Sequence, residues 1–279
     1  MRNMIIQLRP NPDKDAGLAV TKRVAQMLGD YSSVKLCIAP EFLPVMEGTA
    51  SVSSSDGLEP DMYLVMGGDG SVIRTAHRAA ERGIPILSVN LGRMGYLCEV
   101  EPDQLALLKK IPEGLYTLEN RAMLKLTWMR GSSVLLRKDG ILNDVCLTRA
   151  VFSGIADFTV TADGVRKDTY RADGVVIFTP TGSTGYAMSA GGPAMDPALG
   201  VIGCIPICPH AGQSRAILFR DSTVLELCNT CGFGGKLYLT TDGIGTAAIE
   251  PGDVLRVEKS ELSAALVRII GNPKGNRLV

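Results

Sequence analysis

The sequence YLVMGGDGS at residues 63–71 decides the fold of the first half of the chain. Residues 63–66 form an apolar run typical of a buried strand, and a helical pattern follows to Ala80. The stretch therefore predicts a strand, a glycine-rich turn and a helix start. Glycine lets a backbone approach a phosphate closely, and the free N–H groups of a helix start favour anions. The candidate phosphate-binding residues are Gly67, Gly68, Gly70 and Ser71.

Asp69 is the unusual residue of this turn, because a carboxylate repels phosphates. Its presence makes sense if it holds a metal or accepts a proton from an attacking hydroxyl. A tight strand-to-helix turn with an aspartate cap is the alternative without a ligand. Arg74, one turn into the helix, is either a helper for the phosphates or a surface residue. The motif alone indicates phosphoryl transfer or nucleotide binding.

Strands and a helix alternate through the first hundred residues, which predicts a parallel sheet with ligands at the carboxyl ends of its strands. The helix is expected over Asp15–Leu28. Residues 40–61 form a long polar connection, which is either disordered or a mobile lid. The expected strands are Met4–Leu8, Val34–Ile38, Met62–Met66 and Ile84–Val89.

Beyond Glu101 the pattern changes to short alternating runs, after one expected helix at Gln104–Ile111. Three Asp-Gly pairs, at 139–140, 163–164 and 242–243, predict hairpins there. We therefore expect an α/β N-terminal domain with a parallel sheet and a mainly antiparallel all-β C-terminal domain. The predicted active site lies in the cleft between them. The expected bounds are 1–100, completed by 258–279, and 101–257.

Composition narrows the possible partners and the compartment. Lys+Arg and Asp+Glu number 29 each in 279 residues, so no overall field attracts nucleic acid or an anionic membrane. The longest apolar stretch, residues 198–209, is broken by glycines and a proline and does not predict a membrane span. Seven cysteines without an export signal indicate free thiols. We expect a cytoplasmic protein.

A second informative stretch, RADGVVIFTPTGSTGY, occupies residues 171–186. A predicted strand at Val175–Phe178 leads into a loop of hydroxyls and glycines, which can surround a phosphate or a ribose without adding charge. A polar turn without a ligand is the alternative. Asp173, just before the strand, is a candidate acceptor for sugar hydroxyls or an amide. The loop residues concerned are Thr179, Thr181, Gly182, Ser183, Thr184 and Gly185.

Two further stretches contain candidate ligand contacts. Asn143 and Asp144 would point to opposite faces of a regular strand, so only a bend or bulge presents both to one site. Asp144 could then accept two hydrogen bonds from a vicinal diol, although such a pair is also common in turns. In NLGRMGYL, residues 90–97, the glycines suggest close backbone approach, and Tyr96 is either a stacking partner for a base or a core residue.

These four stretches in this order, together with ICPH at 207–210, resemble the NAD kinase family. The resemblance implies transfer of a phosphoryl group from ATP, or polyphosphate in some members, to the 2′-hydroxyl of the adenosine ribose of NAD. It implies Mg²⁺ or another divalent cation carried on ATP, no metal held by the protein itself, and a homo-oligomer, either a dimer or a tetramer. Asp69 would be the proton acceptor. The implied NAD-binding residues are Asp69, Gly70, Arg74, Tyr96, Asn143, Asp144, Arg171, Asp173, Thr181, Thr184, Gly185, Tyr186 and Ser189.

The chain departs from the family pattern at four positions. Asp144 stands where glutamate is usual, Gly185 where alanine is usual, Gly154 where a basic residue often contacts NAD, and Ile244 where glutamine is common. Because GGDG also occurs in diacylglycerol and sphingosine kinases, a lipid kinase is one alternative. A non-catalytic NAD-sensing module is the other.

The cysteines also admit a second interpretation. The pairs Cys204/Cys208 and Cys228/Cys231 could together supply four thiolates to zinc. We expect them instead to be structural or incidental.

Overall fold

The computed structural model describes residues 3–49, 51–149, 155–210, 215–230 and 237–272. The chain divides into two compact units, with boundaries between Asn120 and Arg121 and between Ser263 and Ala264. Unit 1 contains the chain up to Asn120 and resumes at Ala264, and unit 2 is the part between the boundaries. The sequence pattern placed these boundaries at 100/101 and 257/258.

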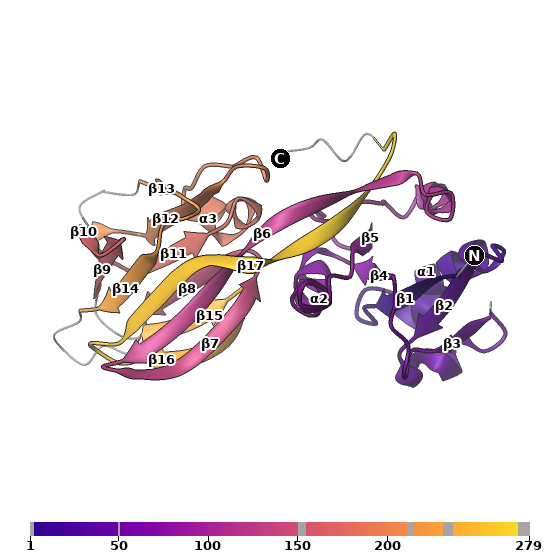
Figure 1. The fold of residues 1–279 in the computed structure, drawn as a ribbon, viewed down its shortest axis with the longest axis horizontal. Helices are drawn as coiled ribbons and strands as arrows, with labels where there is room; N and C mark the ends of the chain where they lie inside the picture. Colours follow the sequence, from indigo (N-terminus) through magenta and orange to yellow (C-terminus); the bar gives the residue numbers. More distant parts are fainter. Residues whose placement is uncertain (1–2, 50, 150–154, 211–214, 231–236, 273–279) are drawn as a thin grey trace. The chain divides into compact units, whose positions relative to one another are not determined.

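Unit 1 is built on five parallel strands in the order β5-β4-β1-β2-β3. The end of β17 extends this sheet beyond β5, because Leu266 pairs in parallel with Ile86. Figure 1 shows β1, β2 and β4 side by side. β4 and β5 are buried along their whole length, as expected for central parallel strands. The strands are β1 (Met4–Pro10), β2 (Val34–Ile38), β3 (Val52–Ser54), β4 (Met62–Gly67), β5 (Ile86–Asn90) and β17 (Val254–Ile269).

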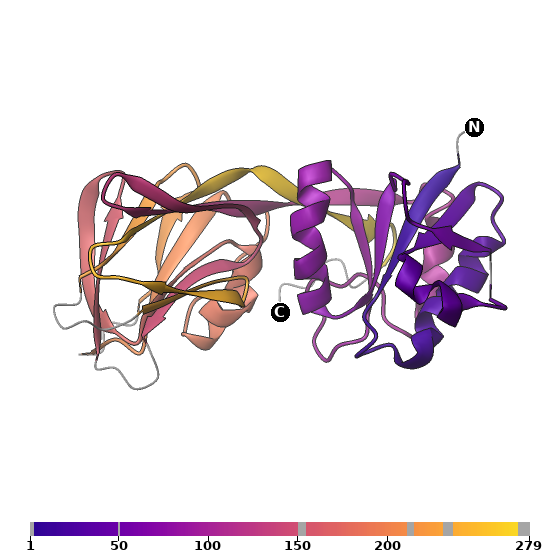
Figure 2. The ribbon, with the colours of Figure 1, turned by 90° about the horizontal axis from the view of Figure 1, so that it is seen from below.

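Helices cover this sheet and bury its apolar residues. α2 (Asp69–Arg82) packs against β4 and β5, as Figure 2 shows, through residues such as Val72 and Ala76. It ends at Gly83, whose φ of 64° favours a residue without a Cβ. A separate core gathers around α1 (Ala19–Gly29) and the short 3₁₀ helix η3 (Leu105–Lys110). A one-turn 3₁₀ helix, η1 (Ala16–Leu18), precedes α1.

Two local predictions for unit 1 need correction. The connection at 40–61 contains the 3₁₀ helix η2 (Pro40–Met46) and the edge strand β3. Phe42, Leu43 and Met46 of this connection pack on the core of unit 1. The helix expected at Gln104–Ile111 is the 3₁₀ helix η3.

Unit 2 contains two antiparallel sheets. One has the order β13-β12-β11-β8-β15-β16, and the other contains β10-β9-β14-β17 with β6 and β7. In Figure 1 the long strands β6 and β17 run alongside each other, in agreement with their pairing. The strands are β6 (Tyr116–Arg130), β7 (Ser133–Ile141), β8 (Asp144–Arg149), β9 (Ala156–Ala162), β10 (Val165–Ala172), β11 (Gly174–Phe178), β12 (Val201–Ile207), β13 (Ile217–Arg220), β14 (Leu225–Asn229), β15 (Leu237–Thr241) and β16 (Ile244–Ile249).

Successive side chains along β8 point alternately into two hydrophobic cores of unit 2. Val145 and Leu147 of β8 belong to a core shared by residues of both sheets. Cys146 faces the opposite way, into a smaller cluster with Val176, Phe178 and Ala187. Because side chains alternate along a strand, Asp144 shares the face of Cys146. This is the face on which the 3₁₀ helix η4 (Thr181–Thr184) and the one-turn helix α3 (Tyr186–Ser189) pack.

The three Asp-Gly pairs have two different structures. Those at 163–164 and 242–243 form the hairpin turns β9–β10 and β15–β16, with positive φ at both residues, as predicted. The pair at 139–140 does not form a turn. It lies inside β7, where the register against β6 shifts between Leu124 and Leu126, so the glycine marks a bulge.

The predicted fold class is confirmed, with a parallel α/β unit followed by a mainly antiparallel β unit. Among the described residues, no helix has the length and apolar character needed to cross a membrane.

Candidate functional site

The carboxyl ends of three neighbouring strands meet around the glycine turn of unit 1. After β1, the N–H of Asn11 donates to the carbonyl of Met66 at 2.9 Å. After β5, the N–H of Leu91 donates to the carbonyl of Gly67 at 2.8 Å. Both loops are therefore fastened to the end of β4, at the sheet edge where parallel α/β folds bind ligands.

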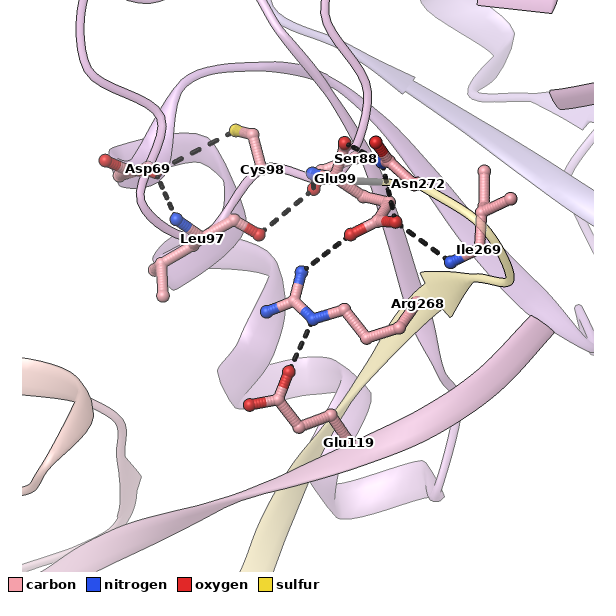
Figure 3. A network of polar contacts seen from close by, with 9 residues as sticks. All are labelled: Asp69, Ser88, Leu97, Cys98, Glu99, Glu119, Arg268, Ile269 and Asn272. Carbon is pink, nitrogen blue, oxygen red and sulfur yellow. Dashed lines mark hydrogen bonds and ion pairs between the residues drawn. The ribbon is translucent and has the colours of Figure 1, made fainter. Parts of the chain in front are cut away.

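Asp69 is the first residue of α2, and both of its carboxylate oxygens accept hydrogen bonds. Figure 3 shows its contacts with Leu97 and Cys98. Oδ2 accepts the N–H of Tyr96 at 3.0 Å, and Oδ1 accepts the N–H of Leu97 at 2.9 Å. The side chain thus fixes the end of the 90–97 loop. The thiol of Cys98 also donates to Oδ1, at 3.8 Å. A carboxylate offers about four acceptor sites, so these three bonds leave room for a further donor. Asp69 is only partly buried, and a ligand hydroxyl could reach it.

The glycines of this turn make room for specific side chains. A Cβ on Gly67 would lie 2.4 Å from Oγ of Ser71, which in turn accepts hydrogen bonds from Asn11 Nδ2 at 2.9 Å and Arg74 at 3.2 Å. A Cβ on Gly95 would collide with Asn90. Gly70 and Arg74 are exposed at the mouth of the turn.

Sequence reasoning missed Lys14, which lies in the loop after β1. Its Nζ atom is 2.7 Å from the position that a Cβ on Gly68 would occupy, and 3.4 Å from the same position on Gly92. The signal was present in the sequence, since Lys14 follows the first strand at the same sheet edge as the GGDG turn.

A buried polar network links the 97–99 segment to the end of β17 (Figure 3). Glu99, 1% exposed, accepts the N–H of Ile269 at 2.9 Å, the Arg268 guanidinium at 3.1 Å and the amide of Asn272 at 2.8 Å. Arg268 also donates to Glu119. The segment that carries Leu97 is thereby anchored to the last strand of unit 1.

In unit 2 the chain bends between β7 and β8, and the carboxylate of Asp242 holds this bend. It accepts the N–H groups of Leu142 at 2.9 Å, Asn143 at 2.6 Å and Asp144 at 3.2 Å. The N–H of Asp242 donates back to the carbonyl of Asp144 at 2.9 Å. Asp242 is the second residue that sequence reasoning missed. It lies about one hundred residues from the bend along the chain, so no local pattern connects the two.

Asp144 is almost fully buried, with 5% exposure. Burial and, after it, the charge of neighbouring Asp242 together raise its pKa to about 7. The thiol of Cys146, two residues along the strand, has a pKa raised to about 12 by burial and by Asp144. Asp144 is therefore a carboxyl group that changes charge near neutral pH.

The hydroxyl-rich loop is held by its own side chains. Thr179 Oγ1 donates to the carbonyl of Leu142 at 2.6 Å and accepts the N–H of Gly182 at 3.0 Å. Ser183, fully buried, donates to the carbonyl of Pro180 and accepts the N–H of Met195. The Thr184 hydroxyl also donates within the loop, to the carbonyl of Thr181 at 3.3 Å, but Thr184 is only partly buried and lies nearer the surface.

The loop also contacts the bend directly. A Cβ on Gly182 would lie 2.1 Å from the carbonyl oxygen of Asn143, so only glycine allows this approach. The side-chain oxygen of Asn143 is buried and accepts no hydrogen bond from the described residues. An unsatisfied buried acceptor is costly, and a ligand donor would satisfy it. The sequence analysis also did not single out Arg121. This residue is buried, and its guanidinium donates to Thr181 Oγ1 at 3.4 Å.

The remaining predicted site residues of unit 2 fall into two groups. Tyr186 is the first residue of α3 and is exposed, and the partial burial of its phenol raises its pKa. Ser189 is exposed at the end of α3. Asp173 and Arg171 lie towards the other end of β11, where Arg149 donates to Asp173 at 2.6 Å and Arg171 pairs with Asp157 at 3.6 Å.

The structure also shows where some of the positions that differ from the family pattern lie, and where three of the cysteines considered for zinc lie. Ile244 is 45% exposed beside the Asp242 turn, and Gly154 and Cys231 lie outside the described residues. No group of three or more His, Cys, Asp or Glu side chains is arranged to hold a metal in the described parts of the chain. Cys204 is buried, Cys208 is exposed and Cys228 is intermediate, and all three are free thiols.

Comparison with known proteins adds sequence and fold relationships to this geometry. Residues 10–116 match the family model of the ATP-NAD kinase N-terminal domain, and residues 142–269 match that of the C-terminal domain. The NAD kinase of Symbiobacterium thermophilum is 37% identical over 265 residues, which cover 94% of this chain and 92% of that protein. The NAD kinase of Caldanaerobacter subterraneus is 35% identical over 264 residues, with 93% and 92% covered.

Two solved structures have a similar fold. The yeast NADH kinase complexed with NADH has a TM-score of 0.84 at 19% identity, with 96% of this chain and 84% of that chain covered. An NAD kinase from Archaeoglobus fulgidus in complex with ATP has a TM-score of 0.71 at 21% identity, with 98% and 97% covered. Family models match both halves of the chain, and relatives above 30% identity span nearly all of it, so the chain belongs to the NAD kinase family.

Proposed function

We propose that this protein transfers the terminal phosphoryl group of ATP to the 2′-hydroxyl of the adenosine ribose of NAD, giving NADP. The observation that carries the proposal is the Asp69 carboxylate at the start of α2, in a glycine turn within the family match. Its two bonds to the N–H groups of Tyr96 and Leu97 fix its orientation and leave acceptor capacity for the attacking hydroxyl. Asp69 is accordingly the general base.

Asn143 and Asp144 hold the ribose in this proposal. The bend presents the Asn143 oxygen, which lacks a donor among the described residues, and a buried carboxyl group. The ionised form of Asp144 accepts two hydrogen bonds from a vicinal diol, although its reach is one methylene shorter than that of glutamate. Tyr186 and the exposed side of the 181–189 loop, including Thr184, Gly185 and Ser189, complete the dinucleotide contacts.

The glycine turn receives the phosphates of the donor. Gly67, Gly68, Gly70 and Ser71 supply backbone N–H groups and a hydroxyl at the positive end of α2. A divalent cation such as Mg²⁺, carried on ATP, supplies further charge neutralisation when it is bound.

Compartment and assembly are also part of the proposal. The cysteines in the described part of the chain are free thiols, which supports a reducing cytoplasm. Assembly as a homo-oligomer follows from the family resemblance, and light scattering at several concentrations tests it.

Mass spectrometry of products after incubation with NAD, ATP and Mg²⁺ tests the reaction. Phosphorylated NAD is expected, and polyphosphate in place of ATP tests the second donor. Phosphorylated diacylglycerol or sphingosine in a parallel reaction would support the lipid kinase alternative. NAD binding without any turnover would support the sensing module.

A further inference from the structure

An ammonium group lies over the glycine turn of unit 1. The Nζ atom of Lys14 is close to the backbone of two separate turns, the one at Gly68 after β4 and the one at Gly92 after β5. A methyl group at position 68 would approach within 2.7 Å of Nζ, and one at position 92 would approach within 3.4 Å. The absence of both side chains makes the space that the ammonium occupies.

The loop of Lys14 is held in place by the backbone. The carbonyl of Asn11 accepts the N–H of Lys14 at 3.0 Å and that of Asp15 at 2.9 Å. Asn11 is itself fastened to the end of β4 through its N–H and to Ser71 through its amide. The backbone of Lys14 is therefore held by the same contacts that build the glycine turn.

No carboxylate neutralises this charge in the part of the chain that the structure describes. The ion pairs found there do not include Lys14. Burial does not explain the placement either, because Lys14 is exposed. A cation beside the first turn of a helix, without an anion of its own, suits an anionic ligand.

We propose that Lys14 binds the phosphates of the nucleotide donor and is a substrate-binding residue of this enzyme. The inference rests on the proposed function and deepens it, because it supplies the fixed positive charge that the GGDG sequence lacks. An ammonium is a compact point charge with three donors, so it can follow a phosphate through the reaction. It also offsets the repulsion between Asp69 and the incoming phosphates.

The test compares Lys14→Met and Lys14→Arg with Lys35→Met, which removes an exposed lysine on β2. Steady-state kinetics are measured with ATP and NAD varied separately. A charged hydrogen bond contributes about 1.5–3 kcal/mol, so the KM for ATP should rise about tenfold or more in Lys14→Met. The KM for NAD should stay within about twofold of its original value. Lys14→Arg should retain part of the affinity, and Lys35→Met should match the wild type.

Two outcomes would overturn the assignment. An unchanged KM for ATP would show that Lys14 is an ordinary surface lysine. A rise confined to the KM for NAD would place it on the dinucleotide instead. Calorimetric binding of tripolyphosphate to wild type and Lys14→Met separates this inference from the proposed function. If the protein shows no kinase activity but tripolyphosphate binding weakens in Lys14→Met, the phosphate assignment holds and the proposed reaction fails.

Discussion

Replacing Asp144 by asparagine should change the pH dependence of stability in a defined direction. The folded carboxyl has a pKa of about 7, raised from 3.8 by burial and by Asp242. Between these two values the folded protein binds one more proton than the unfolded chain at this group. Its contribution to stability is therefore fully present at low pH and is lost as the pH rises through about 7. Asparagine has no proton to lose and removes this dependence.

The size of the effect follows from the two pKa values. At about pH 5.5 the folded carboxyl is almost fully protonated and the unfolded one almost fully ionised, which corresponds to about 2 kcal/mol. At about pH 8.5 both forms are ionised and the contribution is close to zero. Between pH 5.5 and pH 8.5 the wild type should therefore lose about 2 kcal/mol of unfolding free energy that Asp144→Asn does not lose.

Urea unfolding at both pH values measures this difference, and Asp56→Asn, at an exposed loop position, controls for the loss of one carboxylate. Binding of NAD gives a second measurement. The ionised carboxyl can accept two hydrogen bonds from the ribose, so wild-type affinity should increase through about pH 7, whereas the affinity of Asp144→Asn should be nearly constant. If the stability difference varies by less than about 0.5 kcal/mol between the two pH values, Asp144 does not titrate in this range and the reasoning fails.

Three more changes test other parts of the site. Asp69→Asn should lower kcat by about 10²–10⁴-fold. Because an amide offers one acceptor oxygen for the N–H groups of Tyr96 and Leu97, it should also lower the unfolding free energy by about 1–3 kcal/mol. A variant that keeps more than about a tenth of wild-type kcat would exclude the general-base role. Gly182→Ala should abolish NAD binding in a calorimetric titration, because its Cβ would meet the Asn143 carbonyl, whereas Gly185→Ala, with 3.3 Å to its nearest neighbour, should bind normally. Equal binding by these two variants would contradict the assignment of the bend. Metal analysis of chelator-washed protein should find well under one zinc per chain, and stoichiometric zinc lost in Cys228→Ser would contradict this.

Local sequence patterns predicted the fold class because periodicity is a property of short segments. The apolar run before GGDG is a strand, and Asp163-Gly164 and Asp242-Gly243 are hairpin turns. Asp139-Gly140 follows the same local rule and yet forms a bulge. A pairing of β6 with β7 that continues past this position overrides the turn preference. Register between strands is a tertiary property, which the dipeptide does not encode.

The candidate site shows the same division between local and long-range information. Its predicted residues stand where glycines and hydroxyls follow strands, a local signal. The residues that organise the site did not stand out, because each acts across a large separation in the chain. Asp242 holds the bend at Asn143, Lys14 reaches Gly68 from the loop after β1, and Arg121 contacts Thr181. The fold reveals these partners, and only Lys14, which follows the first strand at the same sheet edge, had a signal in the sequence.

Asp69 and Asp242 perform the same physical task in different units. Each collects backbone N–H groups from a distant segment, two from residues 96–97 and three from residues 142–144. Hydrogen bonds to a charged acceptor are stronger than neutral ones, so both segments are held before any ligand arrives. Ordering a loop on binding would consume part of the interaction energy. A carboxylate that fixes its loop in the free protein avoids that loss, which explains why aspartates stand beside the predicted phosphate and ribose contacts, where their charge alone would be unfavourable.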